Sequence, residues 1–142
     1  MNIDSIKNGI VIDHITAGRG MEIYNHLHLG DLDCAVALIK NAQSRKMGRK
    51  DIIKIDEAID LDLNVLGYVD PGVTVDVIRD GVLVEKKSIA LPAELKNILF
   101  CKNPRCITSV EPSLDQIFKL ADASRHLYRC IYCDAERGES RA

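Results

Sequence analysis

The chain has 142 residues and a mass of 15.8 kDa, a length that suits one domain or two small ones. Apolar residues make up 46% of it and charged residues 28%, which is typical of a folded globular protein. A net charge of −2 and an aromatic content of 4% argue against binding to duplex or single-stranded nucleic acid. Because no apolar run is long enough to span a bilayer and no signal peptide begins the chain, we expect a cytoplasmic protein without a membrane partner.

The N-terminal part of the chain predicts alternating strands and helices. A β-branched run over 9–15 indicates a strand, and Ile23 and Leu27 indicate a short amphipathic helix over 21–29. This pattern continues with strands over 32–39 and 49–56, a helix over 59–66 for which a strand stays an alternative, and strands over 73–78 and 82–86 joined by the turn Arg79-Asp80-Gly81. The order predicts an α+β protein that begins with a ferredoxin-like α/β sandwich and carries an extra hairpin strand. One face of such a sheet stays available to a ligand or partner.

The cysteines form one isolated residue and two close pairs. Cys34 lies in an apolar run, and we expect it to be a buried free thiol in a strand. Four residues separate Cys101 from Cys106, two separate Cys130 from Cys133, and 23 lie between the pairs. This spacing is typical of a closed tetrahedral site, so we expect one structural zinc ion per chain, held by these four residues. The metal would stabilise a small C-terminal zinc-binding β domain that cannot hold a good core alone.

Other interpretations of the paired cysteines stay open. Two disulfides would suit a secreted chain, which nothing in the sequence indicates. A redox dithiol would account for Cys130 and Cys133 alone, and an iron–sulfur cluster remains an alternative to zinc. His126, four residues before Cys130, is a competing candidate ligand.

Charge is segregated along the N-terminal part. Residues 40–54 carry a net charge of +5, whereas residues 56–70 carry −5. A basic segment within an acidic chain favours a small anionic ligand, although a solvated hairpin loop would show the same pattern. At the end of the first strand, His14 would suit a phosphate and Asp13 the hydroxyl groups of a sugar, the alternative being a polar strand end. Strand alternation places these two side chains on opposite faces of the sheet.

The chemistry of the residues favours a binding protein over an enzyme. The sequence contains no phosphate-binding glycine loop, dinucleotide-binding fingerprint or nucleophile elbow, and it supplies no catalytic residue. A ferredoxin-like enzyme would need an acid–base or nucleophile constellation, and none is evident. A stand-alone zinc-ribbon adaptor or nucleic-acid-binding protein is the other alternative. It would need a basic zinc region, but residues 101–142 carry seven basic and six acidic residues.

The segments 9–15, 47–55 and 91–101, the two cysteine pairs and Glu111-Pro112 together resemble the regulatory chain of aspartate carbamoyltransferase, over residues 3 to about 137. The resemblance implies a non-catalytic subunit that controls pyrimidine biosynthesis by binding the effectors CTP, ATP and UTP. It implies an allosteric nucleotide-binding domain over 1–92 and a zinc-binding domain over 93–142 that contacts the catalytic chain. It also implies a homodimer of regulatory chains, within a dodecamer of two catalytic trimers and three regulatory dimers.

The same resemblance implies which residues would meet the nucleotide. Asp13 and His14 would contact ribose and phosphate, Lys54 the base and ribose, and Lys86 the phosphates. Ile3, Asp4 and Ser5 match a segment that closes over the nucleotide, and the base pocket would be lined by Ile6, Ile78, Gly81 and Leu83. The chain departs from the family pattern at Asp76, Gly81 and Ser88, where members can carry an amide, an aromatic residue and an arginine.

Overall fold

The structure is a computed structural model, and it describes residues 6–137. The chain divides into two compact units, with residues 1–90 in the first and 91–142 in the second. The segment of Ile3, Asp4 and Ser5, expected to close over a nucleotide, lies outside the described residues. Between residues 6 and 137, no helix has the length and apolar character needed to cross a membrane.

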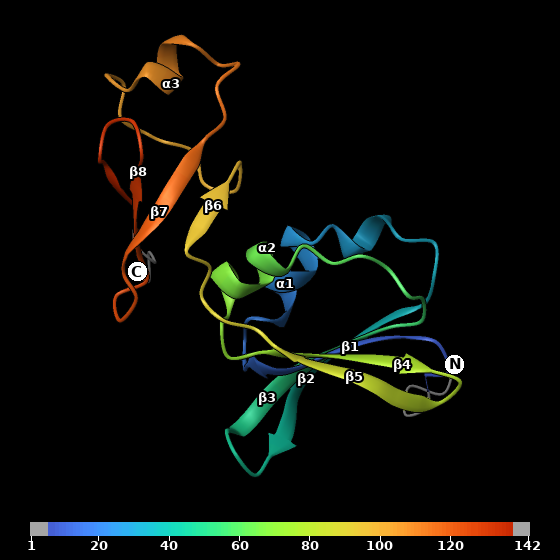
Figure 1. The fold of residues 1–142 in the computed structure, drawn as a ribbon. Coiled ribbons are helices and arrows are strands. Elements are labelled where there is room, and N and C mark those ends of the chain that lie inside the picture. The colour runs from blue at the N-terminus through green and yellow to red at the C-terminus, as the bar shows by residue number, and fades with distance from the viewer. Residues whose placement is uncertain (1–5, 138–142) are drawn as a thin grey trace. The chain divides into compact units, whose positions relative to one another are not determined.

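The first unit contains a five-stranded antiparallel sheet with the order β2-β3-β1-β4-β5 (Figure 1). Its two α-helices lie on one face of the sheet, and β5 extends the sheet beyond β4. This arrangement confirms the predicted ferredoxin-like sandwich with an extra hairpin strand. The elements are β1 (Gly9–Thr16), α1 (Gly20–His26), the 3-10 turn η1 (Leu29–Asp31), β2 (Val36–Ser44), β3 (Gly48–Ile55), α2 (Leu63–Val69), β4 (Thr74–Arg79) and β5 (Val82–Ser88).

The core of the first unit lies between the sheet and its helices. Strand alternation turns Ile12 of β1 to this side, where it is paired with Ile53 of β3 and Val75 of β4. Ile23 of α1 and Leu66 of α2 belong to the same buried cluster, and all five side chains are at most 3% exposed. Because successive strand residues point in opposite directions, the neighbours of these core residues occupy the open face of the sheet.

The second strand begins later than the sequence predicts. The expected strand covers 32–39, whereas β2 begins at Val36, because η1 and the connection after it occupy the preceding residues. Cys34 lies in this connection and is half-buried, so the expectation of a buried thiol within a strand is wrong. Desolvation raises the pKa of the Cys34 thiol, and the neighbouring Glu57 raises it further. The thiol therefore stays protonated at neutral pH.

The second helix also begins later, at Leu63 rather than at residue 59. Asp62 accounts for this start, because its side chain accepts hydrogen bonds from two backbone N–H groups of the first helical turn, at 3.1 and 3.3 Å.

The predicted hairpin between β4 and β5 is confirmed. Asp80 and Gly81 have φ angles of 52° and 77°, the left-handed conformation that a type I′ turn requires at both central residues.

The second unit contains a four-stranded antiparallel sheet with the order β6-β7-β8-β9. Its core is small and centres on Leu95, Phe118 and Tyr128, each 0% exposed. The Tyr128 hydroxyl donates a hydrogen bond to the backbone carbonyl of Pro92 at 2.6 Å. These features confirm the predicted small C-terminal β domain. Its elements are β6 (Glu94–Lys96), α3 (Ile107–Val110), β7 (Ile117–Asp122), β8 (Leu127–Cys130) and β9 (Glu136–Arg137).

Candidate functional site

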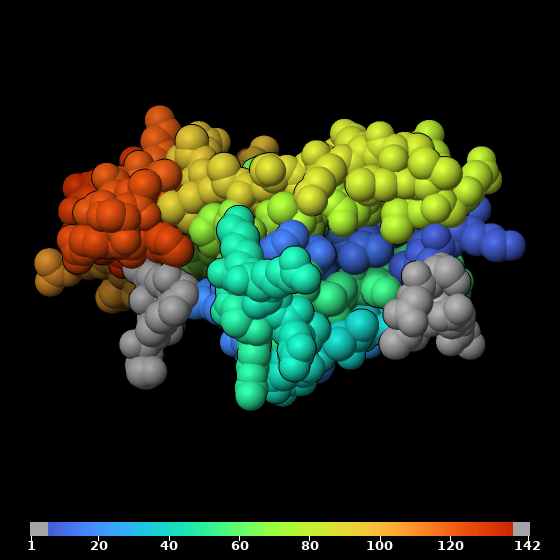
Figure 2. All heavy atoms as spheres, turned by 90° about the horizontal axis from the view of Figure 1, so that it is seen from below, coloured from blue at the N-terminus to red at the C-terminus, as the bar shows by residue number. Residues whose placement is uncertain are grey.

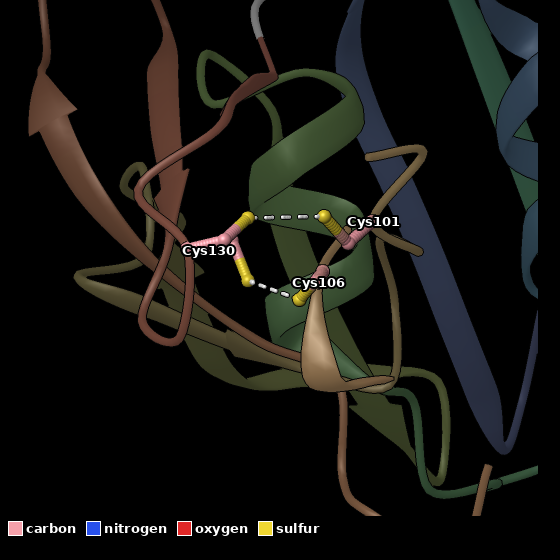
Figure 3. Close-up of side chains that lie close together, drawn as sticks. Cys101, Cys106 and Cys130 are labelled. Carbon is pink, nitrogen blue, oxygen red and sulfur yellow. Dashed lines mark hydrogen bonds between the residues drawn. The ribbon is translucent and has the colours of Figure 1, made fainter. Parts of the chain in front are cut away.

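Four cysteine side chains of the second unit converge on one point (Figure 3). Cys101 and Cys106 lie in the loop before α3, Cys130 ends β8, and Cys133 lies in the turn that follows. All four sulfur atoms lie within 4.8 Å of one another, with 3.5 Å between those of Cys101 and Cys133 and 3.8 Å between those of Cys106 and Cys130. Since a disulfide needs a separation of about 2.05 Å, these are free thiols rather than two disulfides. The group is able to hold a metal ion.

The surroundings of the sulfur atoms favour a bound cation. Burial raises the pKa of Cys101 to about 12 and also raises the pKa of Cys130. By contrast, a hydrogen bond from the backbone N–H of Ala135 lowers the pKa of Cys133 to about 7. Crowded, buried thiols do not ionise together unless a cation compensates their charge, and metal binding therefore releases their protons. Four soft sulfur ligands suit zinc or iron better than magnesium or calcium.

A neighbouring side chain supports the cluster. The Thr108 hydroxyl of α3 donates a hydrogen bond to Cys106 Sγ at 3.1 Å, and both residues are buried. Hydrogen bonds of this kind orient a metal ligand. Within the part of the chain that the structure describes, the group of side chains able to hold a metal contains cysteines only, so His126 is not among them.

The open face of the first sheet, away from its helices, carries residues that are predicted to contact a nucleotide. These residues are paired across neighbouring strands. Lys54 of β3 is paired with Val11 of β1, Val11 with Asp76 of β4, and Asp76 with Lys86 of β5. Figure 2 looks from below Figure 1, on the side of this sheet away from its helices, and shows β1 in blue between the β2–β3 hairpin in teal and the β4–β5 hairpin in yellow-green. Lys54 and Lys86 therefore point to the same side of the sheet from different strands.

Only some of the residues predicted to line the base pocket lie together beside the charged row. Ile78 is paired with Leu83, and Leu83 is 52% exposed, so an apolar surface lies next to the charged row. Gly81 lies in the turn that joins these two strands. Ile6 is only 8% exposed and packs beside Gly9, so this side chain offers a ligand little surface.

Asp13 and His14 lie on the same face of the sheet, which corrects the prediction that alternation separates them. The pairing of β1 with β3 shifts register between Ile12 and Ile15, and His14 adopts a left-handed φ of 59°. This β-bulge brings two consecutive side chains to the open face. Asp13 is paired with Thr74, and His14 Nδ1 lies 3.1 Å from the Thr74 hydroxyl oxygen.

Lys50 also lies in this group on the open face, although it is not among the residues predicted to meet the nucleotide. Its ammonium lies 2.9 Å from Asp13 Oδ1, and both side chains are largely buried. Burial alone would raise the pKa of Asp13, but hydrogen bonds from Lys50 and from the His14 N–H outweigh it and hold the pKa below its usual value. Lys50 lies four residues before Lys54 on the same strand. Strand alternation therefore places both lysines on one face of the sheet, and this spacing is the sequence signal that indicates Lys50.

Asp76 differs from Asp13 because it lacks such partners. It is half-buried, and its Oδ1 atom is buried without a hydrogen-bond partner. Burial raises the pKa of Asp76, Lys86 opposes this rise, and Asp13 adds to it. The open face therefore combines three lysines and a histidine with two carboxylates in different electrostatic states.

A ferredoxin-like sheet with an open polar face, followed by a β unit with four converging cysteines, defines a two-domain chain with a metal-binding module. Residues 1–90 match the family model described as the allosteric domain of the aspartate carbamoyltransferase regulatory chain. Residues 93–142 match the model described as the metal binding domain of the same regulatory chain. The chain belongs to the family of aspartate carbamoyltransferase regulatory chains.

Relatives support this assignment along nearly the whole chain. The aspartate carbamoyltransferase regulatory chain of Clostridium acetobutylicum is 53% identical over 134 residues, which cover 94% of this chain and 92% of that one. The regulatory chain of Clostridium tetani is 47% identical, with 94% of each chain covered. That of Bifidobacterium longum is 46% identical, with 96% of this chain and 98% of that one covered.

Proposed function

We propose that this chain binds CTP, ATP or UTP on the open face of its first sheet and thereby adjusts the activity of a separate aspartate carbamoyltransferase catalytic chain. The observation that carries the proposal is the convergence of four residues from three strands on one sheet face, namely Asp13, His14, Lys54 and Lys86. Residues 1–92 would then be the allosteric domain and residues 93–142 the zinc domain. The chain would act in pyrimidine biosynthesis, and its cytoplasmic location stays a prediction.

The chemistry of the open face suits a nucleoside triphosphate. Lys86 and His14 would donate charge-assisted hydrogen bonds to phosphate oxygens. Asp13 would accept hydrogen bonds from ribose hydroxyl groups, and Lys54 would contact the ribose and base. Beside this row, Leu83 provides exposed apolar surface for the base. The site contains cations, a hydroxyl acceptor and an apolar surface, which are the three elements that a nucleotide needs.

We infer that the four cysteines hold one structural zinc ion per chain. Four thiolate ligands leave no open position for water or a substrate, so the ion would stabilise the fold and take no part in catalysis. The second unit buries few large side chains, chiefly Leu95, Phe118 and Tyr128. A structural zinc ion contributes on the order of 10 kcal/mol to the folding of such a small unit.

The surface around the cysteines supports a contact with the catalytic chain. Ile107, Ile131 and Tyr132 are 51%, 43% and 40% exposed, and each lies next to a cysteine in the sequence. Phe100 and Val110 are more exposed still, at 60% and 73%. Exposed apolar side chains grouped in this way are typical of a protein–protein interface. The metal would therefore order a loop region that presents an apolar docking surface.

A homodimer would form through the edge strand β2. This strand is half-buried and partly apolar, and an open edge of this kind favours pairing with another strand. The basic residues Arg45 and Lys46 follow its end, whereas the acidic Asp56 and Glu57 lie near its start, where the Asp56 N–H donates to the carbonyl of Ala35. Antiparallel pairing of two copies would bring opposite charges together. Three such dimers could join two catalytic trimers into a dodecamer.

Titration calorimetry with CTP and ATP tests the nucleotide site. Lys86→Ala should weaken binding about 10- to 100-fold, because a charged hydrogen bond contributes roughly 1.5–3 kcal/mol. Lys87→Ala is the matched control, since Lys87 is the next residue of β5 and forms an ion pair with Glu85. Carbamoyl-transfer rates of the reconstituted complex, with and without CTP, test the regulation. Unchanged nucleotide affinity in both Lys54→Ala and Lys86→Ala would show that the site lies elsewhere.

A further inference from the structure

Asp76 stands out among the charged residues of the open face. It lies in the middle of the cross-strand row, with Val11 of β1 on one side and Lys86 of β5 on the other. Its side chain is half-buried, and Oδ1 is shielded from water while accepting no hydrogen bond. A carboxylate oxygen that loses water without gaining a donor is destabilised in its ionised form.

The charges around Asp76 do not compensate for this loss. The Lys50 ammonium is already paired with Asp13 Oδ1 at 2.9 Å, so it does little to stabilise an ionised Asp76. The negative charge of Asp13 also raises the pKa of Asp76. Lys86 is the opposing cation paired with Asp76 across the two strands, but it is also the residue proposed to meet phosphates. The charged and titratable groups that face Asp76 are Lys86 from β5, Asp13 and His14 from β1, and Lys50 from β3. A polyphosphate bound here would place further negative charge beside an ionised Asp76.

We propose that Asp76 links nucleotide binding to the uptake of one proton, so that the site accepts a triphosphate together with a protonated carboxyl group. The inference rests on the proposed nucleotide site. Solvent supplies the proton, one Asp76 oxygen carries it, and the O–H donates a hydrogen bond to a phosphate oxygen. No bond of the nucleotide breaks. Asp76 would thus determine how much phosphate charge the site tolerates at a given pH.

The direction of the effect follows from the electrostatics. Burial already favours the neutral form of Asp76 in the free protein, and the phosphate charge would favour it further. Affinity for a triphosphate should therefore rise as the pH falls through the range in which Asp76 takes up its proton. A nucleoside monophosphate, which carries less negative charge, should show a weaker dependence.

Calorimetric titration of CTP into the full chain, in buffers of different ionisation enthalpy, measures the number of protons taken up. The titrations should run from about pH 4, near the ordinary pKa of an Asp carboxyl, to alkaline pH, because burial raises the pKa of Asp76 above its ordinary value. Asp76→Asn keeps the shape of the side chain and removes its charge. Glu85→Gln is the matched control, because Glu85 lies on the same strand next to Lys86 and forms an ion pair with Lys87. The nucleotide phosphates also titrate, but they do so in all three proteins.

The wild-type chain should take up more protons on binding than Asp76→Asn, by up to about one. At the alkaline end, Asp76→Asn should bind CTP on the order of tenfold more tightly than the wild type, since one like charge is removed in partly screened surroundings. Glu85→Gln should match the wild type. Equal proton uptake in the wild type and Asp76→Asn, or weaker binding by Asp76→Asn, would overturn the inference and leave the nucleotide site intact. A wild-type chain that binds no CTP would overturn the proposed site as well.

Discussion

Replacing Asp51 by alanine should strongly destabilise the first unit. This side chain lies on β3, is 0% exposed and accepts three backbone hydrogen bonds. Its Oδ2 atom accepts from Gly18 N at 3.1 Å and Gly20 N at 2.9 Å, and its Oδ1 atom accepts from Asn41 N at 3.0 Å. Asp51 therefore joins β3 to the turn before α1 and to the irregular part of β2.

The magnitude follows from the burial of the three donors. Gly20 is buried, so its N–H would be left without a partner, at a cost of about 1–3 kcal/mol. Gly18 and Asn41 are exposed, so water can replace their hydrogen bonds at a loss of roughly 0.5–1 kcal/mol each. The free energy of unfolding should thus fall by about 2–5 kcal/mol. For a unit of this size, the midpoint of thermal unfolding should fall by roughly 10–30 °C.

Urea unfolding of the full, metal-loaded chain measures this loss, when it is followed by circular dichroism and by hydrogen exchange of amides in the first unit. Asp51→Asn retains one acceptor oxygen and should fall between Asp51→Ala and the wild type. Asp56→Ala is the control, because this exposed carboxylate lies just after the end of the same strand, and its loss should change stability by less than ~0.5 kcal/mol. A loss below ~1 kcal/mol for Asp51→Ala would refute the reasoning, since the buried N–H of Gly20 would then have another partner.

Three further predictions concern the metal, pH and the hairpin. Metal analysis should find about one zinc per chain, and Cys106→Ser should lose the metal and unfold the second unit only, as monitored by hydrogen exchange. Lys50 lowers the pKa of Asp13 in the folded protein, so the wild type should be more stable than Lys50→Met above about pH 4, near the pKa of an unfolded Asp. This difference in the free energy of unfolding should disappear as the pH falls through the lowered pKa. Acid titration of both proteins measures it. Gly81→Val should cost about 1–2 kcal/mol in thermal unfolding, because a β-branched residue resists its φ of 77°.

Much of the fold follows from local patterns in the sequence. Alternation of apolar residues predicts the core side of β1 and β3, and Asp80-Gly81 predicts the hairpin, because both signals act over a few residues. The cysteine spacing likewise predicts that four sulfur atoms converge. These features need no knowledge of distant contacts.

The features that the sequence does not reveal depend on distant pairing. The bulge at His14 forms because β1 meets β3 and β4 with different registers, and neither strand is close to it in the sequence. The contact between Lys50 and Asp13 also depends on the pairing of β1 with the distant strand β3. The late start of β2 likewise depends on how η1 packs, so strand propensity over 32–39 gives the wrong boundary.

The position of β1 in the sheet has a consequence for the synthesis of the chain. Among the strands of residues 6–137, the one made first is the central one, and its two neighbours, β3 and β4, end at Ile55 and Arg79. At about 5–20 residues per second, the ribosome needs roughly 3 to 13 seconds after completing β1 to finish β4. Until β3 is complete, the isoleucines of β1 have no partner strand on either side, and until β4 is complete they lack one of the two. Asp13 and His14 interrupt this apolar run with polar side chains, so the residues proposed to meet the nucleotide would also limit aggregation of the nascent chain.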